Sequence, residues 1–318
     1  MIDFRQARRR ALGIAAAAAF SLLLVSCGGG TGQPPLFSTV VVFGSSLNDT
    51  GNRCILTPNA CPPSPPYAQG RYSNGALWVE TVAAHYGAAL KPSLQGGTNY
   101  AYAGADTGAV PGVTTPPTYP SMVSQVGLYL AKANYQASPQ ALYIVDAGNV
   151  GDNFYYLPTL LQTDPNAATK VVSAAVGDMV NMVLTLYSAG ARNILVTNAP
   201  NVGATPIAQA AGAATAGALA QVSQAFNGAL AQQLAGLKAV SAGLNLYSVD
   251  IYALEAQVKA NPSAYGLTDI ANMCLNTLVP NPPPPCTNPQ QYFYWDDHHG
   301  TAAAYEIIAE KVISTLGQ

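Results

Sequence analysis

Charge is the scarcest property of this 318-residue chain. Only 9% of the residues are Asp, Glu, Lys or Arg, and the formal net charge is −2. A protein that binds nucleic acid needs a basic stripe that neutralises phosphates and releases counterions. Since the sequence has no such stripe, we expect no nucleic-acid partner.

The N-terminus lacks a hydrophobic run long enough for a comfortable membrane span. Residues 11–25 are apolar, but the run is short; several arginines precede it, and Ser26 and Cys27 follow it. A basic start, a short apolar run and small residues before a cysteine are typical of a lipoprotein export signal. We expect cleavage before Cys27 and lipidation of that residue, which would anchor the protein to a membrane. A plain secretory signal with an incidental cysteine is the alternative.

The predicted export signal divides the chain into three parts. Residues 1–26 are the predicted signal peptide, residues 27–36 are a Gly- and Pro-rich flexible linker, and residues 37–318 are long enough for one large domain. The residue after Cys27 is Gly28 and not Asp, which resembles lipoproteins that are sorted to the outer membrane of Gram-negative bacteria. We therefore expect an exported protein, lipid-anchored at the outer membrane, the cell surface or the periplasmic face.

Cysteine is also sparse, and the Cys-x-x-Cys spacing of structural zinc sites is absent. Four cysteines besides Cys27 stand in loop-like sequence, and in an exported chain disulfides are the default reading. Four cysteines permit three pairings, of which we favour the local ones, with zinc binding as the alternative. The expected bridges are Cys54–Cys61 and Cys274–Cys286, and no metal or other cofactor is expected.

Apolar, β-branched runs alternate with long segments of helical periodicity. This alternation implies an α/β fold with a parallel sheet that helices cover on both faces. A Pro-, Gly- and Asn-rich segment, residues 54–72, is predicted to contain no helix. The predicted strands are residues 39–43, 141–145, 193–197 and 245–249, and the predicted helices are residues 74–86, 121–131, 167–188, 210–237 and 301–316.

The first predicted strand leads directly into Gly44-Ser45-Ser46-Leu47. A hydroxyl at the carboxyl end of a buried strand lies on the functional edge of an open α/β sheet, where backbone N–H groups can face an oxyanion. Residues 295–301, Trp-Asp-Asp-His-His-Gly-Thr, supply what such a serine needs. A serine becomes a good nucleophile when a base removes its proton, and that base works best when a carboxylate fixes its tautomer.

These two segments together resemble the GDSL or SGNH hydrolases, a family of serine esterases and lipases. The family's opening Gly-Asp-Ser-Leu reads Gly-Ser-Ser-Leu here, so the resemblance implies that Ser46, and not Ser45, is the nucleophile. The family's closing Asp-x-x-His maps to Asp296 and His299. The resemblance also implies a three-layer, flavodoxin-like arrangement with the catalytic blocks at one edge of the sheet.

Two further blocks imply an oxyanion hole. Residues 99–105 resemble the family's second block, whose glycine N–H helps to build that hole, and the role maps to Gly104. The third block, Gly-x-Asn-Asp, has its best match in residues 147–150, so the resemblance implies that the side-chain amide of Asn149 binds the oxyanion. The Ser46 N–H would be the third donor. An ordinary turn asparagine is the alternative for Asn149.

The chain departs from the family pattern at three positions: Ser45 replaces Asp, Val150 replaces the Asp after the oxyanion Asn, and Gly300 replaces the Pro after the His. None of these changes removes a group that attacks, carries a proton or binds the oxyanion. We therefore expect altered support and retained chemistry.

The residues beside the predicted Asp296–His299 pair offer alternative assignments for the base and its carboxylate. His298 could replace His299 as the base, but we expect Asp297 and His298 to be poorly placed for a shared hydrogen bond, and Asp297 to face solvent. His85 is expected to be structural. Residues 154–156, Phe-Tyr-Tyr, line an acyl pocket or pack in the core.

The resemblance implies a serine esterase or lipase that hydrolyses small-molecule or lipid acyl esters through an acyl-enzyme. Two alternatives remain open: an acyltransferase that uses the same acyl-enzyme, and a catalytically silent surface lipoprotein that binds a glycan or lipid.

Overall fold

The computed structural model describes residues 36–317, apart from the side chains at positions 149 and 151. The predicted signal peptide, Cys27 and all but the last residue of the predicted linker lie outside the described residues. Residues from 36 onward form one compact unit.

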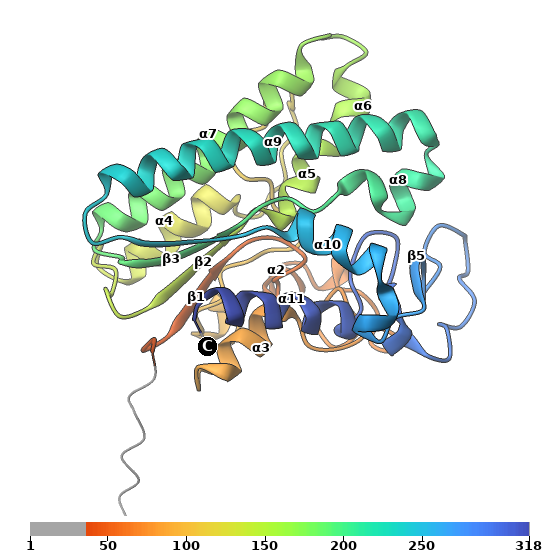
Figure 1. Ribbon diagram of the computed structural model, residues 1–318, viewed down its shortest axis with the longest axis horizontal. Coiled ribbons are helices and arrows are strands. Elements are labelled where there is room, and N and C mark those ends of the chain that lie inside the picture. The colour runs from red at the N-terminus through yellow and green to blue at the C-terminus, as the bar shows by residue number, and fades with distance from the viewer. Residues whose placement is uncertain (1–35, 318) are drawn as a thin grey trace, which may run out of the picture. The chain divides into compact units, whose positions relative to one another are not determined.

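A four-stranded parallel sheet forms the centre of this unit, as the sequence predicts (Figure 1). Every residue of its first two strands is buried, because helices cover both faces of the sheet. In order across the sheet, the strands are β1 (Val40–Phe43), β2 (Leu142–Asp146), β3 (Asn193–Thr197) and β4 (Asn245–Val249).

Three helices cover each face, which confirms the predicted three-layer α/β fold (Figure 1). Successive side chains of β1 point to opposite faces, so Val41 and Phe43 join one core while Val40 and Val42 join the other. The first core lies under α4 (Met122–Lys132), α7 (Ala167–Ser188) and α9 (Ala213–Val240), and the second lies under α3 (Trp78–His85), α10 (Ile251–Ala260) and α11 (Ala302–Thr315).

Among the described helices, α7 is long and apolar enough to cross a membrane by length and composition. Its apolar face packs in the first core through residues such as Val171, Met179 and Leu186. The core helix of a soluble domain meets the same criterion, so this helix is no evidence for a span.

The prediction that residues 54–72 contain no helix is wrong. This region holds the end of α2 (Asn52–Leu56) and all of η1 (Pro58–Ala60). The buried carboxylate of Asp49 accepts hydrogen bonds from the N–H groups of residues 51–53, which satisfies the first turn of α2. A side chain before the segment therefore stabilises a helix that local propensity does not indicate.

The predicted helix 210–237 corresponds to α9, which begins at Ala213. Gly212, with a φ of 98°, separates α9 from the short helix α8 (Pro206–Ala210). A small two-stranded parallel sheet, β5 (Asp269–Met273) with β6 (Tyr292–Tyr294), was not predicted. The remaining short helices are η2 (Ser93–Gln95), η3 (Ala147–Val150), α5 (Gly151–Phe154), α6 (Leu157–Leu160), η4 (Val202–Ala204), η5 (Pro262–Tyr265) and η6 (Pro289–Gln291).

Both local disulfide pairings are confirmed: Cys54 is bonded to Cys61, and Cys274 to Cys286.

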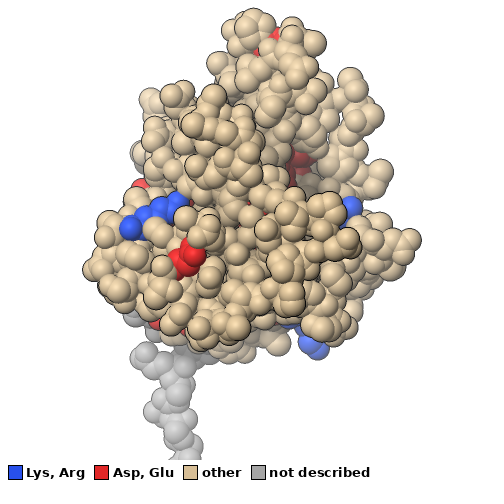
Figure 2. Space-filling model, turned by 90° about the vertical axis from the view of Figure 1, so that its right-hand side faces the viewer, with Lys and Arg blue, Asp and Glu red and all other residues tan. Residues whose placement is uncertain are grey.

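The carboxyl ends of the four strands point toward the side of the molecule that Figure 2 turns to the viewer. That face is almost entirely neutral, and acidic atoms show at the bottom of a hollow in it (Figure 2). The charge distribution agrees with the low charge content of the sequence.

Candidate active site

The turn after β1 presents one of its two serines to a cavity. Gln125 fixes the start of this turn, because its side-chain amide accepts from the Gly44 N–H at 3.0 Å and donates to the Gly44 carbonyl at 2.9 Å. Ser45 is fully buried. Ser46 is 7% exposed and lines a small cavity of about 40 Å³ together with Tyr155 and His298. Of the two serines, Ser46 therefore borders the cavity.

The buried serine is held by a carboxylate that the sequence reasoning missed. The Ser45 hydroxyl donates to the carboxylate of Asp152, and the Ser45 oxygen accepts from the Ser46 N–H at 2.6 Å. Burial raises the pKa of Asp152, against the opposing effects of the Ser45 hydroxyl, His298 and His299. The sequence offered one signal for this role: Asp152 lies two residues after Val150, which replaces the family's Asp.

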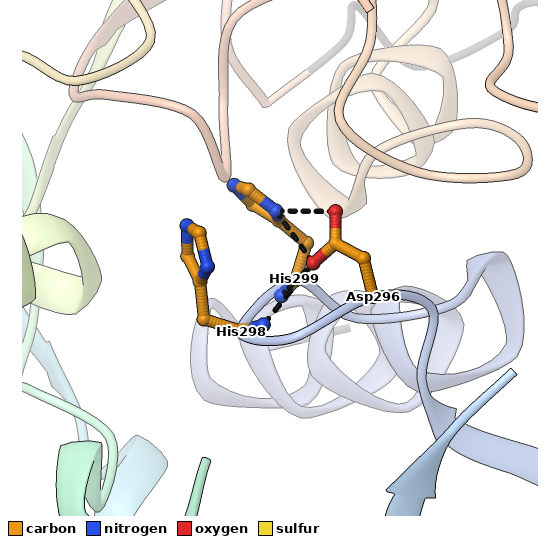
Figure 3. Close-up of side chains that lie close together, drawn as sticks. All are labelled: Asp296, His298 and His299. Carbon is orange, nitrogen blue, oxygen red and sulfur yellow. Dashed lines mark hydrogen bonds and ion pairs between the residues drawn. The ribbon is translucent and has the colours of Figure 1, made fainter. Parts of the chain in front are cut away.

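Asp296 and His299 form a buried pair at the loop before α11 (Figure 3). His299 Nδ1 lies 2.8 Å from each carboxylate oxygen of Asp296, and the His299 backbone N–H donates to the same carboxylate at 2.8 Å. The Tyr67 hydroxyl donates to it at 2.8 Å. Burial alone would raise the pKa of Asp296, but His299, His298 and these hydrogen bonds outweigh burial and lower it. Asp296 is thus held ionised.

The other ring nitrogen of His299 is available for chemistry. Both the ring and the carboxylate are only 4% exposed, and Nε2 is buried with no hydrogen-bond partner among the described residues. Because Asp296 holds Nδ1, Nδ1 carries the proton in the neutral ring and Nε2 is the acceptor. This is the tautomer that a general base requires.

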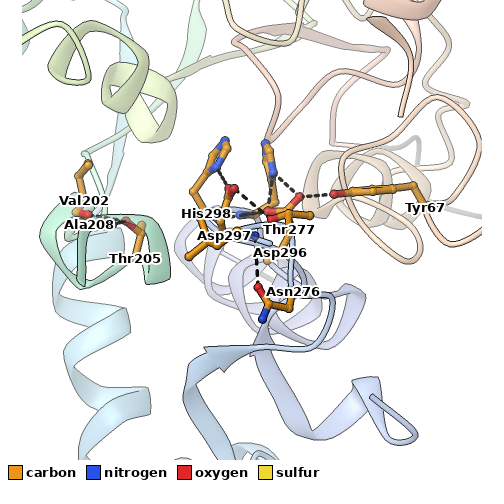
Figure 4. A network of polar contacts seen from close by, with 12 residues as sticks. Tyr67, Val202, Thr205, Ala208, Asn276, Thr277, Asp296, Asp297 and His298 are labelled. Carbon is orange, nitrogen blue, oxygen red and sulfur yellow. Dashed lines mark hydrogen bonds and ion pairs between the residues drawn. The ribbon is translucent and has the colours of Figure 1, made fainter. Parts of the chain in front are cut away.

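His298 lies beside His299 and has its own carboxylate, contrary to expectation. The two imidazole centroids are 3.8 Å apart, and His298 Nδ1 bonds to Asp297, so the expectation that this adjacent pair is poorly placed for a hydrogen bond is wrong. Asp297 does not face open solvent, since it is 18% exposed and accepts from Thr277 at 3.0 Å (Figure 4). Burial lowers the pKa of His298, but Asp297, Asp296 and Asp152 together raise it above its ordinary value.

The predicted oxyanion residues come from loops that lie against the nucleophile turn. The Tyr102 N–H donates to the Gly44 carbonyl at 3.3 Å, and the Ala103 N–H donates to Asp49 at 2.9 Å, so the loop of Gly104 is tied to the loop of Ser46. Gly104 has a φ of 79°, a conformation that favours glycine.

The segment that resembles the family's third block follows β2 and also lies beside Ser46. Gly148 lines the cavity of Ser46, which brings η3 beside the nucleophile. The backbone of Asn149 lies in η3, and its side chain is outside what the structure describes. Of the aromatic segment that follows, Tyr155 lines the cavity, while Phe154 is fully buried in the core against Phe226.

Asp296, His298 and His299 also form the one described group of three side chains that could hold a metal ion, with ligand atoms within 4.8 Å of one another. Nδ1 of each histidine is already bonded to a carboxylate. The three side chains therefore form two carboxylate–imidazole pairs through Nδ1.

Comparison with known proteins agrees with this geometry. The sequence model of the family described as GDSL-like Lipase/Acylhydrolase matches residues 40–312. The chain is 30% identical over 244 residues to the phosphatidylcholine-sterol acyltransferase of Aeromonas hydrophila, covering 76% of this chain and 66%, slightly less than two thirds, of that protein. It is 26% identical to a GDSL esterase/lipase of Arabidopsis thaliana, covering 80% of this chain and 81% of that protein.

Among solved structures, the chain is similar to the lipase Lip_vut3 from a goat rumen metagenome, with a TM-score of 0.48, 11% identity, and coverage of 87% of this chain and 96% of that one. The family match spans the whole sheet, from β1 to most of α11, and includes the nucleophile turn and the Asp–His loop. This protein therefore belongs to the GDSL-like lipase/acylhydrolase family.

Proposed function

We propose that this protein hydrolyses carboxylic acyl esters by forming an acyl-enzyme on Ser46. The observation that carries the proposal is the buried Asp296–His299 pair, whose Nδ1 is held and whose Nε2 has no partner among the described residues. Ser46 lines a cavity, whereas Ser45 does not and is bonded to Asp152, and this difference supports the choice of nucleophile.

In the proposed reaction, His299 Nε2 takes the proton of Ser46 Oγ as that oxygen attacks the ester carbonyl carbon. The N–H groups of Ser46 and Gly104 and the amide of Asn149 hold the oxyanion. His299 then gives its proton to the leaving alcohol, and water repeats the sequence on the acyl-enzyme. Asp296 stays ionised and stabilises the imidazolium.

A fluorophosphonate probe and p-nitrophenyl butyrate together test this assignment. Only an activated serine reacts quickly with the probe, so we expect labelling at Ser46 in the wild type and neither labelling nor turnover in Ser46→Ala. The matched variant Ser45→Ala should keep the label. Loss of both signals in Ser45→Ala, with Ser46→Ala active, would show that the nucleophile is misassigned, and a wild type that does neither would be a silent binding protein.

Acyl transfer to an alcohol is a second candidate, because the relative from Aeromonas hydrophila is named an acyltransferase. The same acyl-enzyme would serve, with an alcohol in place of water. Product analysis with and without an added alcohol or sterol separates the two: hydrolysis gives only the free acid, whereas transfer gives a new ester whose yield rises with the acceptor concentration.

We also propose that the protein is exported and lipid-anchored through Cys27, on the strength of the sequence before that residue. Metabolic labelling with a radioactive fatty acid tests it. The wild type should incorporate label and sediment with membranes, and Cys27→Ala should do neither. Equal labelling of the two proteins would refute the anchor.

A further inference from the structure

A second cavity adjoins the cavity of Ser46. It has a volume of about 50 Å³ and lies where the carboxyl edge of the sheet meets α10 and α11. The two cavities share five wall residues, among them Leu47, which directly follows the nucleophile. The shared residues are Leu47, Gly148, Pro200, Thr205 and His298. The two cavities therefore lie side by side, and the second is within the reach of a short chain attached to the carbonyl carbon at Ser46.

The wall of this second cavity is mainly apolar. Ile251, Phe293 and Ile308 contribute to it, and its carboxylates already have partners. Asp146 bonds to the Thr197 hydroxyl, and Glu255 accepts from the Asn201 N–H at 2.9 Å. Burying an apolar chain here removes hydrocarbon surface from water without stripping these acids of their hydrogen bonds.

Gly300, the last of the three departures from the family pattern, helps to open this cavity. It lines the cavity, and its φ lies outside the region that requires glycine. A Cβ at this position would lie 3.2 Å from Cε1 of Tyr305 and 3.4 Å from Cβ of Ala304, which are two other wall residues. The absence of a side chain therefore leaves room between the His299 loop and α11.

On the basis of the proposed function, we infer that this second cavity binds the acyl chain of the ester and selects short chains. A volume of about 50 Å³ holds about four groups of water size, given roughly 10–15 Å³ for each. A methylene is similar in size, so a butyryl group fills the cavity and an octanoyl group exceeds it. Ile308, on α11, bounds the cavity and is not one of the proposed catalytic residues.

The test measures kcat/KM for p-nitrophenyl acetate, butyrate and octanoate. In the wild type we expect about a fourfold gain per added methylene up to butyrate, the factor that corresponds to about 0.8 kcal/mol per buried CH₂, and a fall at octanoate. Ile308→Ala enlarges the cavity and should raise the octanoate-to-butyrate ratio about tenfold or more. Ile308→Phe fills it and should lower the butyrate-to-acetate ratio about tenfold.

Ile313→Ala is the matched control, since Ile313 is also a partly buried residue of α11 in the second core but does not line the cavity. Its two ratios should stay within about twofold of the wild type. Gly300→Ala adds a methyl group to the cavity wall beside Ala304 and Tyr305 and should lower the butyrate-to-acetate ratio, so it provides the test if Ile308→Phe does not fold.

Two outcomes would overturn the inference, and they differ. If the wild type hydrolyses esters but the Ile308 and Gly300 variants keep the ratios of Ile313→Ala, the acyl chain lies elsewhere and the proposed function stands. If the wild type hydrolyses none of the esters and resists fluorophosphonate labelling, the proposed function itself is refuted.

Discussion

At the residue scale, the nucleophile turn depends on a carboxylate from another part of the chain. Asp152 holds the hydroxyl of Ser45, whose oxygen lies 2.6 Å from the Ser46 nitrogen. That N–H is also a proposed oxyanion donor, so it must turn from the Ser45 oxygen to the oxyanion during the reaction. Asp152 thereby acts as a positioning residue and supplies, from α5, the acid that is missing at position 45 and at position 150.

Replacing this acid should weaken catalysis without abolishing it. Asp152→Asn exchanges a charge-assisted hydrogen bond, which contributes about 1.5–3 kcal/mol, for a neutral one that contributes about 0.5–1.5 kcal/mol, and it also alters the field at the turn. We expect kcat to fall about 10- to 100-fold with little change in KM. The control is Asp164→Asn, which changes an exposed acid paired with Lys170. A rate within twofold of the wild type would show that Ser45 holds the turn unaided.

The two adjacent histidines should differ sharply in their contributions. His299→Ala removes the proposed general base, and we expect a loss of about 10⁴-fold or more in kcat. His298→Ala removes a ring that packs on His299 and lines the cavity, so we expect a loss of about 10-fold. Purified variants assayed with p-nitrophenyl butyrate decide this. The reverse ranking would make His298, with Asp297, the catalytic pair.

At the element scale, the four central strands could be predicted from sequence nearly to the residue. The prediction for 193–197 and for 245–249 matches β3 and β4, because continuous apolar, β-branched runs bounded by polar residues have few alternatives in an α/β chain. The flanking helices followed from their periodicity, and both disulfides from their local spacing.

What sequence could not predict depends on tertiary contacts. The helix α2 is stabilised by Asp49, a residue outside it, and β5 is half-exposed without the alternation that marks a strand. At the site, Asp152 belongs to no family block, and its position two residues after Val150 was the one signal for it; the turn of η3 and α5 carries it to Ser45. Because Asp297 and His298 are adjacent in sequence, we expected no hydrogen bond between their side chains. The conformation of the loop nevertheless brings the Asp297 carboxylate to Nδ1 of His298.

The disulfide Cys274–Cys286 should support the Asp–His loop. The Cys274 N–H donates to the carbonyl of Tyr294 at 3.0 Å and the Leu275 N–H donates to the carbonyl of Trp295 at 2.7 Å, directly before Asp296. Closing a 12-residue loop stabilises the fold by about 3 kcal/mol in the chain-entropy treatment.

We expect the double variant of Cys274→Ser and Cys286→Ser to lose about 3 kcal/mol in unfolding free energy, measured with urea, and to lose activity in native buffer. Removing Cys54–Cys61 in the same way serves as the comparison, since it closes a shorter loop of seven residues and should cost slightly less stability. Unchanged turnover in the first variant would show that β6 holds the Asp–His loop without the bridge.

At the scale of the whole molecule, buried acids couple stability to pH. Burial raises the pKa of Glu255 to about 7, against the opposing effects of Lys259 and the Asn201 N–H. Burial and the neighbouring Asp152 raise the pKa of Asp106 to about 7, against the Tyr156 hydroxyl. Both side chains are less than a tenth exposed. Their ordinary values in the unfolded chain are 4.5 and 3.8.

The direction of the pH effect follows from proton binding. Between about pH 4 and pH 7 the folded state binds more protons than the unfolded state, so stability falls as pH rises. Each of the two acids contributes up to about 1.4 kcal/mol per pH unit within that window. His298, whose pKa is also raised, adds stability that is present below its ordinary pKa and is lost as pH rises through its folded-state pKa. All three groups therefore favour the fold at mildly acidic pH.

We expect the melting temperature to be several degrees higher at pH 5.5 than at pH 8. The double variant of Asp106→Asn and Glu255→Gln keeps the shapes of both side chains but removes their titration, so its melting temperature should vary much less over this range. Thermal unfolding followed by circular dichroism at both pH values provides the measurement. A double variant as sensitive to pH as the wild type would show that other groups control the stability of the fold.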